Sequence, residues 1–374
     1  MPMAYPDRSL PSWRRGMCLI AALALLVAGI ALIPSRADAR SHVPASFLGV
    51  TPNDNKYTTY DGNQLRLEKG VGVGLFRQLF DWNKIETSRG HYDFKRTDDF
   101  VLGAAHKGIT ILPILFDAPA FRARQDPNAR ITYPPNNLND IGTFGAQLVK
   151  RYGPNGNLWR GANRKFRKYG IRSWQIWNEP NLPVYWGGHP NAGQYTRMLR
   201  GAASGIKHAD RHAEIVTAGL PQSTLKGAIP LSRYLPQLLK AKAARYFTTV
   251  AANAYAHNAS GILKILAGVR KTLNRGHASR ANIWLTEFGW SDKGPASQFR
   301  LGARGQATQL NALIVGAARQ RSALRLRGFI YYNWQDFDPS GRGDFVGNHQ
   351  GLLTVSGKTK PAFGSYGSAA RRIR

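Results

Sequence analysis

Two glutamates lie at the ends of apolar stretches in this 374-residue chain. In WQIWNEPN (174–181), apolar and aromatic residues run directly into Asn178 and Glu179, and in NIWLTEFGW (282–290) a similar stretch reaches Glu287. A carboxylate at the end of a buried strand costs free energy unless it is paired or used. If the two carboxylates meet, one negative charge disfavours the other, so one can stay protonated while the other is ionised. Such a pair could act as an acid and a nucleophile.

The elements that must position these glutamates alternate along the chain. Apolar or β-branched stretches predict eight strands, at 47–50, 71–79, 109–116, 173–178, 214–220, 248–255, 282–290 and 328–334. Helical patterns separate most of them, at 95–107, 139–152, 193–209, 230–243, 261–274 and 302–321, while the link 51–70 is the least regular. This alternation predicts βαβ units and a parallel sheet.

Eight such units predict an α/β fold, a (β/α)8 TIM barrel forming a single catalytic domain, for which about 250 residues plus loops are typical. The alternative is an open doubly wound sheet. That fold is disfavoured because no glycine-rich phosphate fingerprint follows the first predicted strand.

Functional residues of a barrel lie at the carboxyl ends of its strands. The residues predicted there are Arg77, Asn178, Glu179, Tyr255, Glu287 and Trp334. Further aromatic side chains are expected to stand around the two carboxylates, namely Trp82, Tyr185, Trp186 and Trp290. Paired carboxylates among aromatic rings, which stack on sugar faces, indicate the chemistry of glycoside hydrolysis.

Two of these motifs resemble the clan A glycoside hydrolases, whose catalytic glutamates lie on strands four and seven. The motifs are IWNEPN (176–181) and LTEFGWS (285–291). FRQLFDWNKIETSRGHYDFKRTDDF (76–100) and GLLTVSGKTKPAFGSY (351–366) are similar to segments of family 39, and family 5 is the next most similar. The resemblance covers most of the chain after residue 39.

The resemblance implies a retaining double displacement, with Glu179 as general acid/base and Glu287 as nucleophile, about 5–5.5 Å apart. It further implies that Arg77 and Tyr255 bond Glu287, that Asn178 bonds the sugar 2-hydroxyl and that Trp334 floors the −1 subsite. The sequence departs from the family on the sixth strand, where many relatives read His-x-Tyr and this chain has Asn253-Ala254-Tyr255. From the residues alone, Glu179 and Arg77 could also be a structural carboxylate and a structural ion-pair partner.

The N-terminus has the pattern of a secretory signal peptide. Arg14 and Arg15 precede an apolar run (17–33), and Ala37-Asp38-Ala39 follows as a small-residue cleavage site. We therefore expect a signal peptide at 1–39, a glycoside hydrolase domain at 40–374, and a secreted or envelope-retained protein. The alternative is an uncleaved membrane anchor, for which the apolar run is short. The single cysteine, Cys18, lies in this segment, so the mature chain could form no disulfide.

The chain is strongly basic, with a formal net charge of +31, and loss of residues 1–39 would leave +29. This charge favours an anionic cell-envelope polymer as a partner. No nucleic-acid module is recognisable, so specific nucleic-acid binding is not expected. His189, His257 and His349 lack metal-ligand spacing, and no metal or organic cofactor is implied. A monomer is expected.

The function predicted is hydrolysis of O-glycosidic bonds, β-linked by preference, in a poly- or oligosaccharide. Three alternatives remain open: a non-catalytic carbohydrate-binding barrel, a transglycosylase using the same site, and a basic envelope or nucleic-acid binder whose affinity would survive loss of the glutamates. The sugar, the linkage and endo or exo action are not determined by these motifs.

Overall fold

The computed structural model describes residues 43–52, 62–126, 131–340 and 343–374. The predicted signal peptide lies outside the described residues, so it and the domain boundary at residue 40 stay predictions. Within the described ranges, no helix is both long and apolar enough to cross a bilayer.

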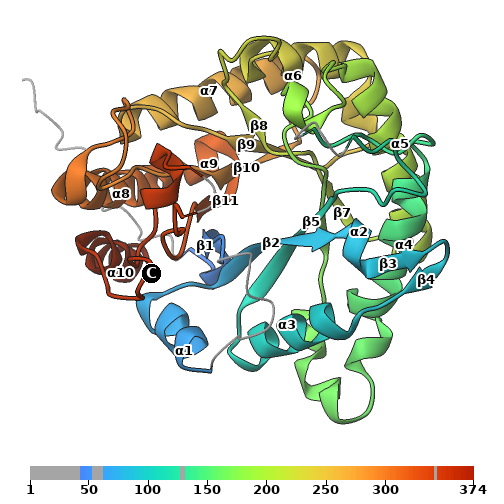
Figure 1. The fold of residues 1–374 in the computed structure, drawn as a ribbon, viewed down its shortest axis with the longest axis horizontal. Helices are drawn as coiled ribbons and strands as arrows, with labels where there is room; N and C mark the ends of the chain where they lie inside the picture. Colours follow the sequence, from blue (N-terminus) through green and yellow to red (C-terminus); the bar gives the residue numbers. More distant parts are fainter. Residues whose placement is uncertain (1–42, 53–61, 127–130, 341–342) are drawn as a thin grey trace, which may run out of the picture. The chain divides into compact units, whose positions relative to one another are not determined.

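Eight parallel strands of the described chain close into a barrel, which confirms the predicted α/β class and (β/α)8 architecture (Figure 1). Every predicted strand is present, with its ends shifted by a few residues. In order around the barrel they are β1 (Leu48–Val50), β2 (Leu75–Asp81), β5 (Thr110–Phe116), β6 (Ser173–Ile176), β7 (Glu214–Val216), β9 (Thr249–Asn253), β10 (Asn282–Glu287) and β11 (Leu326–Tyr331), which returns to β1. The two-residue strand β8 (Leu220–Pro221) pairs with β9.

Helices surround the barrel where the sequence predicts them. Those expected are α3 (Lys95–His106), α4 (Asp140–Tyr152), α5 (Ala192–Ala209), α6 (Leu231–Lys240), α7 (Ala259–Arg275) and α8 (Gly302–Arg319). In the irregular link after β1, helix α1 (Gly62–Val71) is described. The remaining helices were not predicted: the short α2 (Trp82–Ile85) and α9 (Arg321–Leu324), and α10 (Pro361–Ile373), which starts at a proline in its first turn. A small hairpin, β3 (Glu86–Ser88) and β4 (His91–Tyr92), follows α2.

A buried apolar cluster fills the lower part of the barrel. It consists of one side chain from each of six strands, Leu75, Leu112, Val216, Ala251, Trp284 and Ile330. Neighbouring residues such as Phe76 belong instead to the larger core between strands and helices. Since side chains alternate along a strand, Arg77, two residues after Leu75, also points into the barrel. The apolar cluster therefore lies beneath the polar residues at the carboxyl ends of the strands, which form the mouth of the barrel.

Candidate active site

Arg77 joins three strands at the mouth of the barrel. The residue is 2% exposed. Nη1 lies 3.1 Å from Glu287 Oε2, Nη2 donates to Asn178 Oδ1 at 2.9 Å, and Nε donates to Gln175 Oε1 at 2.9 Å. One guanidinium thus fixes residues from β6 and β10 relative to β2, with the planar fork geometry that suits arginine. The predicted neighbours Arg77, Asn178 and Glu287 do lie together.

Glu287 reaches the mouth through an irregularity in the sheet. Leu285 lies opposite Ala252 of β9, but Glu287 lies opposite Asn253, so Thr286 is an extra residue in β10. Such a bulge breaks the alternation of side chains and redirects the next one. Tyr255 donates its hydroxyl to Glu287 Oε1 at 2.8 Å. Both carboxylate oxygens of Glu287 therefore accept hydrogen bonds, one from a guanidinium and the other from a phenol.

Glu179 is turned into the mouth by an unusual backbone. Trp177 and Glu179 have φ angles of 71° and 47°, in the left-handed region that non-glycine residues rarely adopt. The backbone N–H of Glu179 donates to the carbonyl of Gly219 at 3.1 Å, and the indole of Trp177 donates to the carbonyl of Tyr185 at 2.8 Å. Each such residue costs about 1–3 kcal/mol, and this conformation often occurs at functional sites.

Asn253 lies between the two glutamates. Its Nδ2 is 2.7 Å from Glu179 Oε1 and 3.3 Å from Glu287 Oε2. Thr286 donates to Asn253 Oδ1 at 2.9 Å, which fixes the orientation of the amide. The two carboxylate oxygens can be no further apart than the sum of the two Nδ2 distances. One oxygen of each carboxylate thus lies within hydrogen-bond reach of the same amide nitrogen, so the two side chains approach each other closely.

The sequence marked Asn253 only as a departure from the family pattern, and did not place it in the site. Its position two residues before Tyr255, on the same face of the strand, was the available signal. Gly219 makes room for it, because a Cβ at residue 219 would lie 2.2 Å from Asn253 Oδ1. Gln175, which accepts a hydrogen bond from Arg77, was also missed; as a polar residue inside an apolar strand it too was visible in the sequence.

The two glutamates sit in different electrostatic surroundings. Burial, followed by the charge of Glu287, raises the pKa of Glu179 to about 8, although Asn253 and Arg77 oppose the shift. Glu179 is therefore mainly protonated at neutral pH, while Glu287 has the arginine as its direct partner. Burial raises the pKa of the Tyr255 hydroxyl well above its ordinary value, so Tyr255 stays a hydrogen-bond donor.

The tryptophans expected around the site do not present ring faces to it. Trp82, Trp186, Trp290 and Trp334 are all at most 2% exposed. Trp82 stacks on Phe144 with centroids 5.0 Å apart, and Trp334 packs against Phe363 of α10. The expected platform and floor roles are thus not supported, because large apolar rings after the strands turn back between the strands and the helices.

Partly exposed aromatic rings stand at the mouth instead. Phe116, the last residue of β5, packs edge-on against Tyr185, and Tyr255 packs in the same way against Phe299. Burial and then the charges of Glu179 and Glu287 raise the pKa of the Tyr185 hydroxyl, which indicates that it lies near both. Of the aromatic residues expected around the carboxylates, Tyr185 and Tyr255 are the ones found there.

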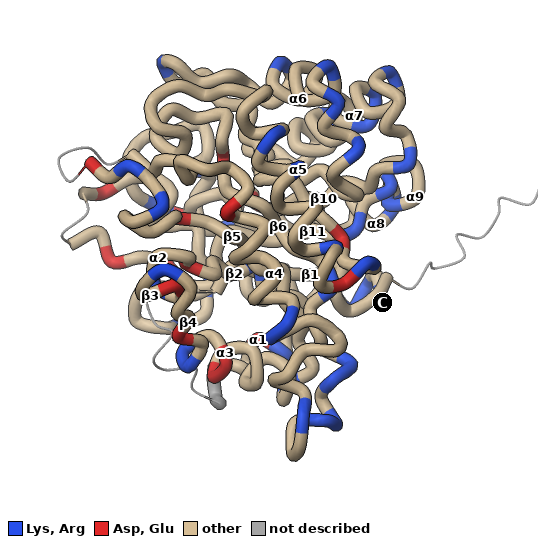
Figure 2. The backbone as a smooth tube through the Cα atoms, turned by 90° about the vertical axis from the view of Figure 1, so that its right-hand side faces the viewer, with Lys and Arg blue, Asp and Glu red and all other residues tan. Residues whose placement is uncertain are grey.

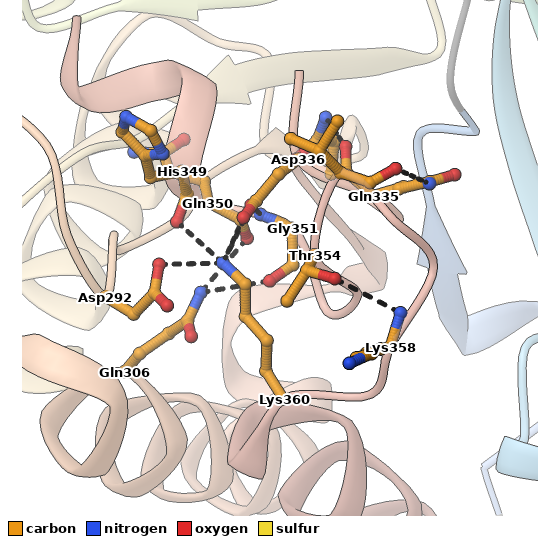
Figure 3. Close-up of polar contacts among 12 residues, drawn as sticks. Asp292, Gln306, Gln335, Asp336, His349, Gln350, Gly351, Thr354, Lys358 and Lys360 are labelled. Atoms are coloured by element: carbon orange, nitrogen blue, oxygen red, sulfur yellow. Dashed lines mark hydrogen bonds and ion pairs between the residues drawn. The ribbon is translucent and has the colours of Figure 1, made fainter. Parts of the chain in front are cut away.

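A second polar cluster, centred on Lys360, supports the loops beside Glu287 (Figure 3). Lys360 is 5% exposed, and its Nζ lies 2.7 Å from both Asp292 and Asp336 and 3.2 Å from the carbonyl of His349. These partners come from the loops after β10 and β11, while Lys360 immediately precedes α10. The contacts fix the two loops to each other, and the carboxylates here are engaged by an internal cation.

Histidines and carboxylates do not gather into a metal site in the part of the chain that the structure describes, where no group of three His, Cys, Asp or Glu could hold an ion. His257 contacts the carbonyl of Gln298, and His349 contacts Asp344. The residues that could act chemically are thus the two glutamates, Arg77, Asn178, Asn253 and Tyr255.

The fold is similar to those of solved glycoside hydrolases. A family 39 glycoside hydrolase from Bacteroides cellulosilyticus WH2 superposes with a TM-score of 0.63 at 19% identity, over 88% of this chain and 64% of that one. A monomeric β-xylosidase from Caulobacter crescentus CB15 superposes with a TM-score of 0.63 at 16% identity, over 86% of this chain and 67% of that one. Xylanase 10B from Thermotoga maritima superposes with a TM-score of 0.56 at 13% identity, over 88% of this chain and 96% of that one.

This chain spans about two thirds of the length of the first two structures and nearly all of the third. Neither a family model nor a curated protein matches the chain by sequence. The predicted likeness to clan A, and to family 39 within it, is confirmed for the fold.

Proposed function

We propose that the protein is a retaining glycoside hydrolase that cleaves O-glycosidic bonds of a poly- or oligosaccharide, and that it is secreted. The observation that carries the proposal is a set of hydrogen bonds around the two glutamates. Asn253 Nδ2 donates to both carboxylates, and of the two only Glu287 accepts a hydrogen bond from Arg77. This arrangement brings a protonated and an ionised carboxyl group close enough for one sugar to meet both. Retaining glycosidases need such a pair about 5–5.5 Å apart.

In the first step, Glu179 donates its proton to the leaving oxygen while Glu287 attacks the anomeric carbon and forms a glycosyl ester. Glu179 is then ionised, and it takes a proton from the water that breaks the ester. Glu287 leaves as a carboxylate, again held by Arg77 and Tyr255. Asn178, whose Oδ1 accepts a hydrogen bond from Arg77, is the residue we expect to bond the 2-hydroxyl of the sugar. The −1 sugar would contact Tyr185 or Phe116 rather than a tryptophan.

The similar structures suggest which substrates to test first. Structures of similar fold include a β-xylosidase and a xylanase, so aryl β-xylosides and xylan are suitable first substrates. The transglycosylase alternative uses the same two steps, with a sugar hydroxyl in place of water. Product analysis separates the two, since only transfer gives products longer than the substrate.

The test compares Glu287→Ala and Glu179→Ala on aryl β-glycosides with good and poor leaving groups. A good leaving group needs no proton, so Glu179→Ala should still release one equivalent of phenol in a burst, whereas Glu287→Ala should release none. Asp338→Asn, an exposed change in the loop after β11, is the matched control and should behave like the parent. Turnover that survives in Glu287→Ala would exclude the mechanism. A parent that is inactive on every glycan but binds one of them would favour the carbohydrate-binding barrel.

A further inference from the structure

Basic residues far outnumber acidic residues at one end of the barrel. The connections that lead from a helix into the next strand lie at the base, away from the mouth. In the described chain these are residues 72–74, 107–109, 153–172, 210–213, 241–248, 276–281 and 320–325. They contain one acidic residue, Asp210, and the basic residues Lys107, Arg160, Arg164, Lys165, Arg167, Lys168, Arg172, Arg211, Lys242, Arg245, Arg280, Arg321 and Arg325.

Two long stretches of the chain, which include several of these connections, lack acidic residues. No Asp or Glu occurs from 141 to 178 or from 215 to 286. In Figure 2, basic segments gather around α7, α8 and α9, and acidic segments lie around α2 and β3. Among the ion pairs of the described residues, none involves Lys242, Arg280 or Arg325, and all three side chains are exposed. Unbalanced like charges repel each other and attract a polyanion.

A hollow of about 660 Å³ opens within this basic end. It is lined by the residues that precede β9 and β10, including His277 and Arg280, and by Glu214 at the start of β7. Glu214 does not oppose an anion there, since Arg327 binds both of its oxygens at 3.2 and 2.9 Å and Ser173 donates to it at 2.6 Å. The hollow is thus a concave surface with net positive surroundings.

Basic residues are kept at this end in backbone conformations that suit glycine better. Lys242, His277 and Arg325, which precede β9, β10 and β11, have φ angles of 64°, 56° and 50°. A left-handed conformation costs a residue with a Cβ about 1–2 kcal/mol, and glycine nothing comparable. These side chains do not contribute to the core, because all three are exposed. For Lys242 and Arg325, the positive charge is the property that a glycine would lack.

We propose that the base of the barrel binds an acidic polysaccharide, with the hollow at β7, β9 and β10 and the surrounding Lys and Arg side chains holding its carboxylates. The inference rests on the proposed function for the choice of a glycan as the polyanion. Strand β2 has seven residues, so the base lies roughly 20 Å from the mouth. A chain held there anchors the enzyme to an acidic matrix and is separate from the bond being cut.

A lipid surface fits this end less well. Helices and loops that bind membranes place apolar side chains into the interface. The exposed large hydrophobic residues of the described chain are Leu67, Val184, Leu225, Phe345 and Val355, and none of them lies in the connections at the base. The contacts offered are therefore hydrogen bonds and ion pairs to a solvated polymer.

The experiment measures binding of polygalacturonate by calorimetry, with all proteins carrying Glu287→Gln so that no chain is cut. The base variant combines Lys242→Gly, Arg280→Gln and Arg325→Gly. The control variant removes three exposed lysines from connections at the mouth, through Lys226→Gln, Lys293→Gln and Lys358→Gln. Both variants lose three positive charges, one at the base of the barrel and the other at its mouth. Glycine suits the two left-handed positions, and circular dichroism confirms that the fold is retained.

The base variant should bind about tenfold or more weakly at low salt and lose part of the salt dependence of affinity, while the control variant binds nearly as the parent does. Equal losses in the two variants would show a response to net charge alone and overturn the proposed site. Binding of phosphatidylglycerol vesicles without binding of polygalacturonate would overturn the choice of partner, and so would binding of nucleic acid alone. Turnover of a small aryl glycoside, measured with Glu287 restored, tests the proposed function separately.

Discussion

The mouth and the base of the barrel use the same uncommon backbone conformation for side chains in different surroundings. Non-glycine residues with positive φ in the described chain are Asp117, Trp177 and Glu179 at the mouth, and Lys242, His277 and Arg325 at the base. At the mouth, the conformation turns Glu179 toward Glu287 and into a shared set of hydrogen bonds. At the base, it leaves side chains exposed and without acidic partners.

The difference shows how one fold can bear two kinds of charged site. Carboxylates at the mouth are partly buried, so their mutual repulsion changes a pKa and prepares them for proton transfer. Basic groups at the base stay in water, where their summed field attracts large anions. The four predictions below test this contrast, beginning with the largest effect.

Replacing Arg77 by Gln removes the cation that holds Glu287 and also frees Asn178. We expect kcat/KM to fall by about 10²–10³, the loss typical of removing one aligned group that stabilises a transition state. Steady-state kinetics on an aryl glycoside measure the change. A variant within tenfold of the parent would show that Arg77 is only a structural ion-pair residue.

Gly219→Ala should displace the side chain of Asn253, which packs against Gly219. The new Cβ would lie 2.2 Å from Asn253 Oδ1, so the amide that bridges the glutamates must move. A displacement of about 1 Å in an active site can reduce activity by about 10²-fold, and we expect a loss of ten- to a hundredfold in kcat/KM. Gly268→Ala in α7 is the control, since a Cβ there meets nothing within 4 Å. Equal activity of the two variants would contradict a role for Asn253.

Glu179→Gln should make folding stability less dependent on pH. The folded pKa of about 8 lies above the ordinary value of 4.5, so the folded state retains a proton that the unfolded state loses. Glu179 therefore lowers stability progressively as pH rises from 4.5 to 8, by at most about 1.4 kcal/mol per pH unit, and has no such effect below 4.5. Urea unfolding at pH 4, 6 and 8 should show a gain for the variant that grows with pH. A constant difference would contradict the raised pKa.

The smallest effect is expected at the base. Lys242→Gly and Arg325→Gly relieve an unfavourable φ but add chain entropy to the unfolded state, so each should change stability by no more than about 1 kcal/mol. Activity on a small aryl glycoside should not change. Lys240→Gly, in the last turn of α6, is the comparison and should destabilise the protein by about 0.5–1 kcal/mol. A large loss of stability in the two left-handed variants would show that these residues are retained for the fold.

Periodicity was sufficient to predict the barrel, since each strand is a local apolar stretch and each predicted helix carries its own pattern. It was insufficient for α10, whose sequence PAFGSYGSAARRI starts at a proline and is rich in small residues. The tryptophans show a different limit. Sequence position places Trp82, Trp186 and Trp290 after strand ends, but whether a ring faces the mouth or the helices depends on the turn that follows.

The two glutamates, Arg77 and the barrel itself could be identified from the sequence because they depend on residue type and order along the chain. Tertiary structure decided the distances and the charges. The bulge at Thr286 and the left-handed turn at Glu179 orient the two glutamates. The hydrogen bonds from Asn253 then join it to residues 34 and 74 positions away. Tertiary structure also gathered the basic connections at one end. Burial and through-space electrostatics depend on such long-range neighbours, and local patterns contain no record of them.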